Sequence, residues 1–168
     1  EWEEKLIYRA IALAITAFAA GILFCCADQP KSEDISVEEA TYKACSLHAE
    51  GKCSEAIRFV ESYLNDLGER RDSALSMQLP FLFLELADCY TALGRYQKAD
   101  SALLGADAIL AVVNDSDSLR AIALIQRGIT QWLLGNNDAA ERLHLDALGM
   151  LEARYPSHHP VVMDAFNM

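Results

Sequence analysis

The sequence repeats one short pattern three times at an almost constant spacing. Each copy consists of a glycine, four further residues and an alanine, and the copies begin at Gly51, Gly94 and Gly135. Successive copies start 43 and 41 residues apart. A period near forty residues is typical of helical repeat proteins, in which each unit buries its apolar face by stacking on the next. The spacing therefore predicts a solenoid.

The residues around the second glycine indicate what one unit contains. Apolar side chains recur at helical spacing over residues 83–93, before Gly94, and again over residues 96–110. Glycine readily adopts the conformation that ends a helix, so we expect the chain to turn back there as a second helix. Nothing alternates with a period of two over a useful length, which argues against strands. The predicted fold is all-α: a right-handed α-solenoid of helix-turn-helix repeats.

We expect these repeats over residues 36–70, 76–114 and 118–156, with a fourth beginning over residues 160–168. The first helix of the second repeat should begin near Ser76, which leaves Pro80 in or next to its first turn. Small residues should let the two helices of each repeat approach closely. They are Ala44, Ala87 and Gly128 on the first helices, and Ala56, Ala99 and Ala140 on the second.

An uncharged stretch precedes the repeats, over residues 10–27. As a helix it would extend roughly 27 Å, close to the thickness of a hydrocarbon core. The sequence thus predicts an N-terminal hydrophobic helix over residues 1–27, a membrane anchor through residues 6–27 or a signal, followed by a linker over residues 28–35. Lys5 and Arg9 lie before the apolar stretch and acidic residues follow it, so the positive-inside rule places the repeats on the extracytoplasmic side.

Three alternatives to a retained anchor stay open. Cleavage near Ala27 would yield a secreted or periplasmic protein, and acylation of Cys25 or Cys26 would yield a lipoprotein. The third alternative is a buried helix of the folded domain. The chain starts with Glu1 rather than Met and stops within an apolar segment, so we expect a fragment or a processed product.

The third copy carries the most complete set of motifs. Residues 124–160 contain a Leu-Gly turn at Gly135, an Ala-Leu pair beginning at Ala147 and a closing His-Pro step at His159. This combination resembles the tetratricopeptide repeat family, in the longer-period variant found in kinesin light chain. The resemblance implies a helical repeat fold and protein binding, and it says little about which partner is bound.

The resemblance covers residues 36–168 and is weakest in the first copy. There Glu50 stands where the other two copies have a leucine, and Cys53 stands where the family usually has an aromatic residue. Terminal repeats are often atypical, which accounts for such departures.

Charge and motif content exclude several classes of function. The chain has 25 acidic residues against 14 Lys and Arg, a net charge of -11 that repels phosphate backbones, so we expect no nucleic acid partner. The sequence contains no GxSxG, no Walker loop and no GxGxxG. We therefore expect no enzyme activity, no catalytic residue and no cofactor.

Potential metal ligands and thiols are few. Glu141 and His144 have the Glu-x-x-His spacing of di-iron sites, but no second copy accompanies them, so we interpret them as an exposed polar pair. His158 and the adjacent His159 fit a repeat-ending loop better than a metal site. Three cysteines follow the linker, and we expect small buried residues rather than ligands, with a disulfide between the first two as the alternative. They are Cys45, Cys53 and Cys89.

The inner face of such a solenoid is lined by the first helix of each repeat, and we expect a peptide to bind there. Helical phase predicts a mixed surface on the first two repeats and an apolar one on the third. An alternative interpretation is that the apolar surface of the third repeat packs against the following repeat. The candidate peptide-binding residues are Thr41, His48, Leu84, Asp88, Thr91, Ile125, Ile129 and Trp132, with Cys45, Phe81 and Ile122 on the same lines.

Together these features predict a protein–protein interaction scaffold or adaptor, tethered to a membrane and binding an unidentified protein or peptide. One alternative is a regulatory repeat segment of a larger membrane-bound enzyme or receptor, and another is a secreted repeat protein. A homo-oligomer is a further option, since small residues line one side of the hydrophobic segment.

Overall fold

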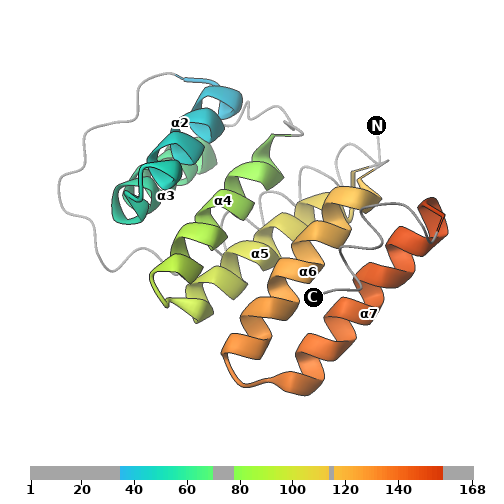
Figure 1. The fold of residues 1–168 in the computed structure, drawn as a ribbon. Coiled ribbons are helices and arrows are strands. Elements are labelled where there is room, and N and C mark those ends of the chain that lie inside the picture. The colour runs from blue at the N-terminus through green and yellow to red at the C-terminus, as the bar shows by residue number, and fades with distance from the viewer. Residues whose placement is uncertain (1–34, 70–77, 114–115, 157–168) are drawn as a thin grey trace.

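The computed structural model describes residues 35–69, 78–113 and 116–156. These residues form six α-helices and no strand, so the all-α prediction is confirmed for this part of the chain. The helices pair as three hairpins that stack side by side (Figure 1). They are α2 (Val37–Ala49) with α3 (Cys53–Glu69), α4 (Leu79–Ala92) with α5 (Tyr96–Leu110), and α6 (Asp117–Leu133) with α7 (Asn137–Arg154).

Several predictions from the sequence lie outside the described residues. They concern the N-terminal helix over residues 1–27, all but the end of the linker over residues 28–35, the start of a fourth repeat over residues 160–168, and Ser76. The adjacent His158 and His159 fall there too. None of the six described helices combines the length and the apolar character that crossing a bilayer requires.

Each hairpin turns at the glycine that the repeat pattern singles out. Gly51, Gly94 and Gly135 have φ angles of 74°, 70° and 84°. After α4, the Gly94 amide donates to the Thr91 carbonyl at 2.9 Å and the Arg95 amide donates to the Tyr90 carbonyl at 2.8 Å. These bonds satisfy carbonyls that a helix end otherwise leaves unpaired. The predicted role of the repeated glycine is therefore confirmed.

Two of the helices begin with different devices. Ser36 caps α2: its hydroxyl accepts a bond from the Glu39 amide at 3.2 Å, and the Glu39 carboxylate accepts from the Ser36 amide at 2.8 Å. In α4, Pro80 lies in the first turn, where the lost N–H has no partner within the helix. Pro80 thus occupies the expected place in a helix that begins at Leu79.

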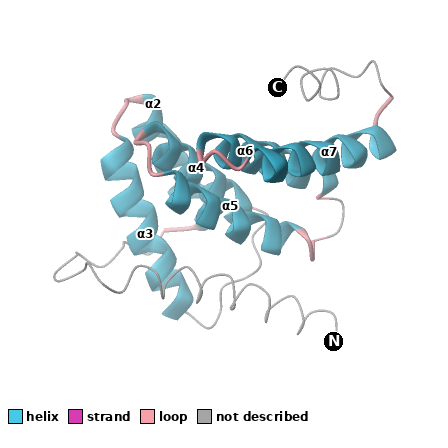
Figure 2. Cartoon of the chain, turned by 90° about the horizontal axis from the view of Figure 1, so that it is seen from below, coloured by secondary structure: helices cyan, strands magenta, loops and turns pink. Residues whose placement is uncertain are grey.

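Two clusters of buried side chains hold the hairpins together. The larger cluster joins α2, α3, α4 and α5 and includes Ala123 of α6, and its biggest fully buried members are Phe83 and Tyr90 of α4. A smaller cluster joins α6 to α7 through Ala121, Leu124 and Leu151, together with Ala147. Figure 2 shows the stack with α2 and α3 at one end and α7 at the other. The second hairpin therefore lies in the middle of the stack.

The close approach of α6 and α7 depends on Gly128, as the small-residue pattern predicts. A Cβ atom at this position would lie 2.2 Å from Cδ2 of His144. The imidazole of His144 therefore packs directly on the α6 backbone, with Nε2 buried. The prediction of an exposed Glu141 and His144 pair is wrong for the histidine, because the missing side chain at Gly128 leaves room for its ring.

Candidate functional site

The spacing of the turn glycines makes positions on α2, α4 and α6 equivalent, since 43 residues separate the first pair and 41 the second. Thr41, Leu84 and Ile125 are equivalent by this rule, as are His48, Thr91 and Trp132. These three helices are the first helices of their hairpins. The predicted binding residues therefore fall on matching rows across the stack.

Helix α6 presents an apolar strip formed by Ile122, Ile125, Ile129 and Trp132. The Trp132 side chain is 63% exposed and Ile122 is 41% exposed, whereas Ile125 and Ile129 are half-buried. These residues recur every three or four positions, so they lie along one side of the helix. An exposed tryptophan on such a strip is a typical anchor for a protein partner.

Helix α4 presents a different row from the one that helical phase suggested. Leu84 is buried in the larger core cluster, so it is not on the surface. Phe81 is exposed, and Glu85, Asp88 and Thr91 are half-buried. The sequence reasoning missed Glu85, although its position four residues after Phe81 places it on the same side of the helix.

Helix α2 contributes polar groups and one aromatic residue that the sequence analysis overlooked. Thr41 is half-buried, and its hydroxyl donates to the Val37 carbonyl at 2.8 Å. Cys45 and His48 are also half-buried. Tyr42, one residue after Thr41, is 78% exposed. We call the exposed and half-buried side chains of α2, α4 and α6 the first-helix face. Its principal members are Tyr42, His48, Phe81, Glu85, Asp88, Ile122, Ile125, Ile129 and Trp132.

Polar side chains bridge the three first helices. Nδ1 of His48 on α2 lies 3.2 Å from Oε2 of Glu85 on α4. Nε2 of Gln126 on α6 donates to both carboxylate oxygens of Asp88 at 3.2 and 3.3 Å. Burial and the nearby Glu85 raise the pKa of Asp88, while His48 and Gln126 lower it. The centre of the first-helix face therefore contains two carboxyl groups, of Glu85 and Asp88, that partners on the neighbouring helices hold in position.

A second group of side chains gathers where the first hairpin meets α4. One donor atom from each of His48, Cys53 and Cys89 lies within 4.8 Å of the others. Cys53 and Cys89 are buried as expected, whereas Cys45 is half-buried. The sequence suggested Cys45 as the partner of Cys53, but Cys89 lies with Cys53 instead, because α4 brings it there from the next hairpin.

The surroundings of two thiols in this region, Cys45 and Cys89, raise their pKa values. Burial, followed by the neighbouring Glu85, raises the pKa of Cys45 to about 11. Burial, followed by the neighbouring Cys53, raises the pKa of Cys89 to about 12. The thiolate is the reactive form, so these cysteines do not suit covalent catalysis. Sulfur and imidazole donors grouped in this way instead suit a metal ion.

Comparison with known proteins agrees with this architecture. Residues 79–153, from the start of α4 through most of α7, match the family model described as tetratricopeptide repeat. Among curated proteins, none matches the chain. The second and third hairpins are therefore similar to tetratricopeptide repeats, which generally mediate protein–protein interaction.

Proposed function

We propose that the protein is a scaffold that binds a segment of a partner protein on the first-helix face. The observation that carries the proposal is the exposed apolar strip of α6, above all Trp132. Burying large apolar side chains in a partner is the main source of affinity in protein interfaces, and tryptophan is enriched among the residues that contribute most. The match of residues 79–153 to tetratricopeptide repeats supports the same class of function.

The chemistry of the face favours an extended peptide with apolar and basic side chains. The strip on α6 offers contacts to apolar anchors, and Glu85 and Asp88 on α4 offer acidic ones. The chain as a whole has a net charge of -11, so a basic segment is also attracted from a distance. We propose a partner segment whose basic residues lie over α4 and whose apolar residues lie over α6.

A peptide selection experiment tests this function. The full chain, purified in detergent, is offered a library of random displayed peptides, and we expect enrichment of peptides that combine Lys or Arg with large apolar residues. Affinity for these peptides should fall at least 10-fold in a variant carrying Trp132→Ala and Ile129→Ala. The matched control is Leu145→Ala, which removes an exposed leucine from the second helix α7.

Enrichment of acidic peptides, or equal weakening by Leu145→Ala, would contradict the proposed face. Selection of no peptide at all would favour the alternative in which a following repeat covers the strip on α6. The helical circular dichroism of each variant should match that of the original chain, so that loss of binding is not loss of fold.

We also propose that residues 6–27 tether the protein to a membrane with the repeats on the extracytoplasmic side. The support is the uncharged sequence of residues 10–27 and the position of Lys5 and Arg9 before it. The full chain should stay with membranes through carbonate extraction, and a protease added from the extracytoplasmic side should digest the repeats. Deleting residues 1–34 should release a helical protein. A full chain that leaves the membrane with carbonate would contradict the anchor.

A further inference from the structure

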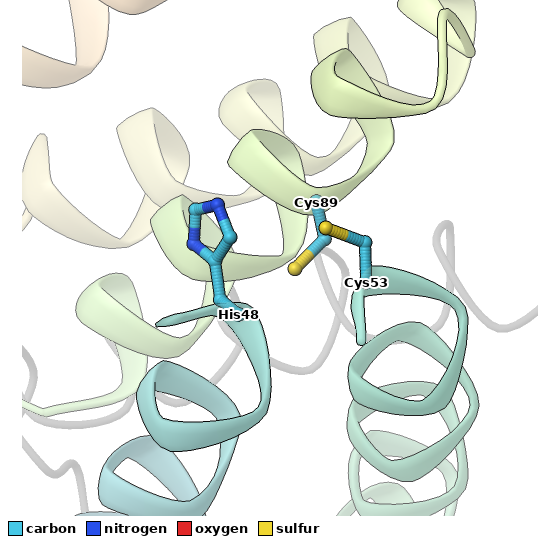
Figure 3. Close-up of side chains that lie close together, drawn as sticks. All are labelled: His48, Cys53 and Cys89. Atoms are coloured by element: carbon cyan, nitrogen blue, oxygen red, sulfur yellow. The ribbon is translucent and has the colours of Figure 1, made fainter. Parts of the chain in front are cut away.

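We propose that His48, Cys53 and Cys89 form a binding site for a thiophilic metal ion, and that its ordinary occupant is Zn²⁺. The three side chains come from three elements: the last turn of α2, the first residue of α3 and the second half of α4 (Figure 3). Two sulfur donors and one imidazole form a set that soft and borderline cations prefer over calcium or magnesium. The ion would join the first hairpin to the second.

The local backbone explains why the donors converge. The Gly51 amide donates to the His48 carbonyl at 2.8 Å, and the Lys52 amide donates to the Leu47 carbonyl at 2.8 Å. This tight turn returns the chain so that Cys53 lies beside the end of α2. Helix α4 packs on both α2 and α3 and supplies Cys89 from the other side.

The distances between the three donor atoms are close to the distances between ligand atoms around a bound ion. Tetrahedral Zn²⁺ with S and N ligands requires donor atoms about 3.7 Å apart. The three donor atoms lie within 4.8 Å of one another, so an ion would draw them together by at most about 1 Å. The backbone need not move, because rotation of the three side chains can supply a shift of this size.

Packing does not demand these residue types. At the next junction of the stack, the positions equivalent to His48, Cys53 and Cys89 are occupied by Thr91, Tyr96 and Thr130, and that junction is also well packed. The same architecture is thus built without any sulfur or imidazole donor. All three residues that can bind a metal occur together at one junction. A requirement for small buried residues does not explain why they do.

Neighbouring groups support the site. Glu85 Oε2 contacts Nδ1 of His48 at 3.2 Å, so Nδ1 donates to the carboxylate and Nε2 keeps the lone pair that a metal needs. A carboxylate behind a histidine ligand is the usual outer partner in zinc sites. Glu85 and the nearby Asp88 also add negative charge, which favours a cation.

When the two thiols bind Zn²⁺ they form a dithiolate complex, and the two protons that they release pass to the solvent. The protein supplies three ligands, so water takes the fourth position. The His48 side chain is 34% exposed, which provides the ion with a route from solvent. Cys53 and Cys89 close the opposite side, since both are buried.

The test uses the full chain, purified in detergent under reducing conditions, with Cys25→Ser and Cys26→Ser as the common background. These changes remove the two thiols outside the described residues. Cobalt titration should give one equivalent of tetrahedral Co²⁺ with a sulfur-to-cobalt charge-transfer band, and Zn²⁺ should displace it. Native mass spectrometry should show one zinc gained and two protons lost.

Variants assign the donors. Cys53→Ser, Cys89→Ser and His48→Gln should each weaken zinc binding by more than about 100-fold, and Glu85→Gln by about 10–100-fold, the range for outer partners of metal ligands. Cys45→Ser is the matched control and should leave affinity and spectrum unchanged. Serine at position 89 should fold, because Thr130 places a hydroxyl at the equivalent position of α6.

Any of the following results would overturn the site. One is the absence of stoichiometric zinc or cobalt binding by the reduced protein. Another is an unchanged cobalt spectrum in both Cys53→Ser and Cys89→Ser, or a loss of binding in Cys45→Ser equal to theirs. The third is a reduced protein that ignores zinc and forms a Cys53–Cys89 disulfide in air, which would make the two sulfurs a redox pair instead.

Discussion

Gly94 adopts a φ angle of 70°, in a region where a side chain is strained, whereas Gly149 lies inside the helix α7 with open space where a Cβ atom would lie. The two residues therefore respond oppositely to the same change. Gly94→Ala should lower the free energy of unfolding by about 1 kcal/mol, because alanine disfavours the left-handed conformation. Gly149→Ala should raise it by about 0.5–1 kcal/mol, because alanine favours a helix interior.

Denaturant unfolding of the two variants measures both effects. An unchanged Gly94→Ala would show that the turn glycine has been placed wrongly, and a destabilised Gly149→Ala would show that position 149 is not an open site in a helix interior. The sequence predicted the role of Gly94 because three glycines recur at one spacing, and only a repeated backbone turn makes such a pattern.

At Gly128 a side chain is excluded by a neighbouring residue and not by the backbone conformation. A Cβ atom there would meet the ring of His144 at 2.2 Å, so Gly128→Ala should destabilise the protein by about 1–3 kcal/mol. In a His144→Ala background the ring is absent, and the same change should be nearly neutral. A thermodynamic cycle over the four proteins measures the coupling.

A coupling energy near zero in that cycle would mean that Gly128 and His144 do not meet. The sequence indicated a small residue at position 128 from its place in the repeat. It did not indicate His144 as the neighbour. Which residues of two helices are in contact depends on how the helices are aligned along each other, and the repeat pattern does not give that alignment.

At the level of elements, the start of α2 depends on a reciprocal cap. The Ser36 amide and hydroxyl bond to the Glu39 carboxylate, and this holds the pKa of that carboxyl below its ordinary value. A group whose pKa is lower in the folded state stabilises the protein above its unfolded pKa and loses that effect as the pH falls. Glu39→Gln should therefore lower the melting temperature at pH 7 and have progressively less effect below about pH 4.5.

Thermal unfolding across pH 3–7 checks this prediction. Glu38→Gln is the control, because it removes a charge from the same turn and leaves the bonds between Ser36 and Glu39 intact. If the two variants have equal effects at every pH, the cap contributes nothing beyond helix-dipole electrostatics.

The faces of α4 and α6 show which surface residues can be predicted from the periodicity of apolar residues. Helix α6 has apolar and polar sides, so periodicity placed its four apolar residues, from Ile122 to Trp132, on one side of the helix. Helix α4 lies in the middle of the stack and is apolar on almost every side, so periodicity does not select one face. Leu84 was therefore placed on the surface, and Glu85 was missed.

At the level of the whole molecule, the described hairpins should differ in local stability. Helices α4 and α5 lie within the larger core cluster, to which α6 contributes Ala123, whereas α7 belongs to the small cluster that it shares with α6. Amide exchange should therefore be slowest in α4 and α5 and faster in α7, since local opening follows the apolar area buried. Hydrogen exchange followed by mass spectrometry measures this order. Stronger protection in α7 than in α4 would contradict it.

The group of His48, Cys53 and Cys89 was the hardest feature to predict. Its third member comes from another hairpin, and no local spacing links Cys89 to the other two. The period of the repeat did predict the hairpins and their turns, which together determine where those residues meet. A repeat pattern thus predicts architecture, while the chemistry at a junction depends on contacts between units.

We propose above that the first-helix face binds a partner protein. Photo-crosslinking from single positions of the full chain in its membrane tests it most directly, with the photoreactive residue benzoylphenylalanine replacing Trp132 on α6 or, as control, Leu145 on α7. Both positions are well exposed. We predict that one protein is captured from position 132 and not from position 145. Capture of the same proteins from both positions, or from position 145 alone, would contradict a binding site on the first-helix face.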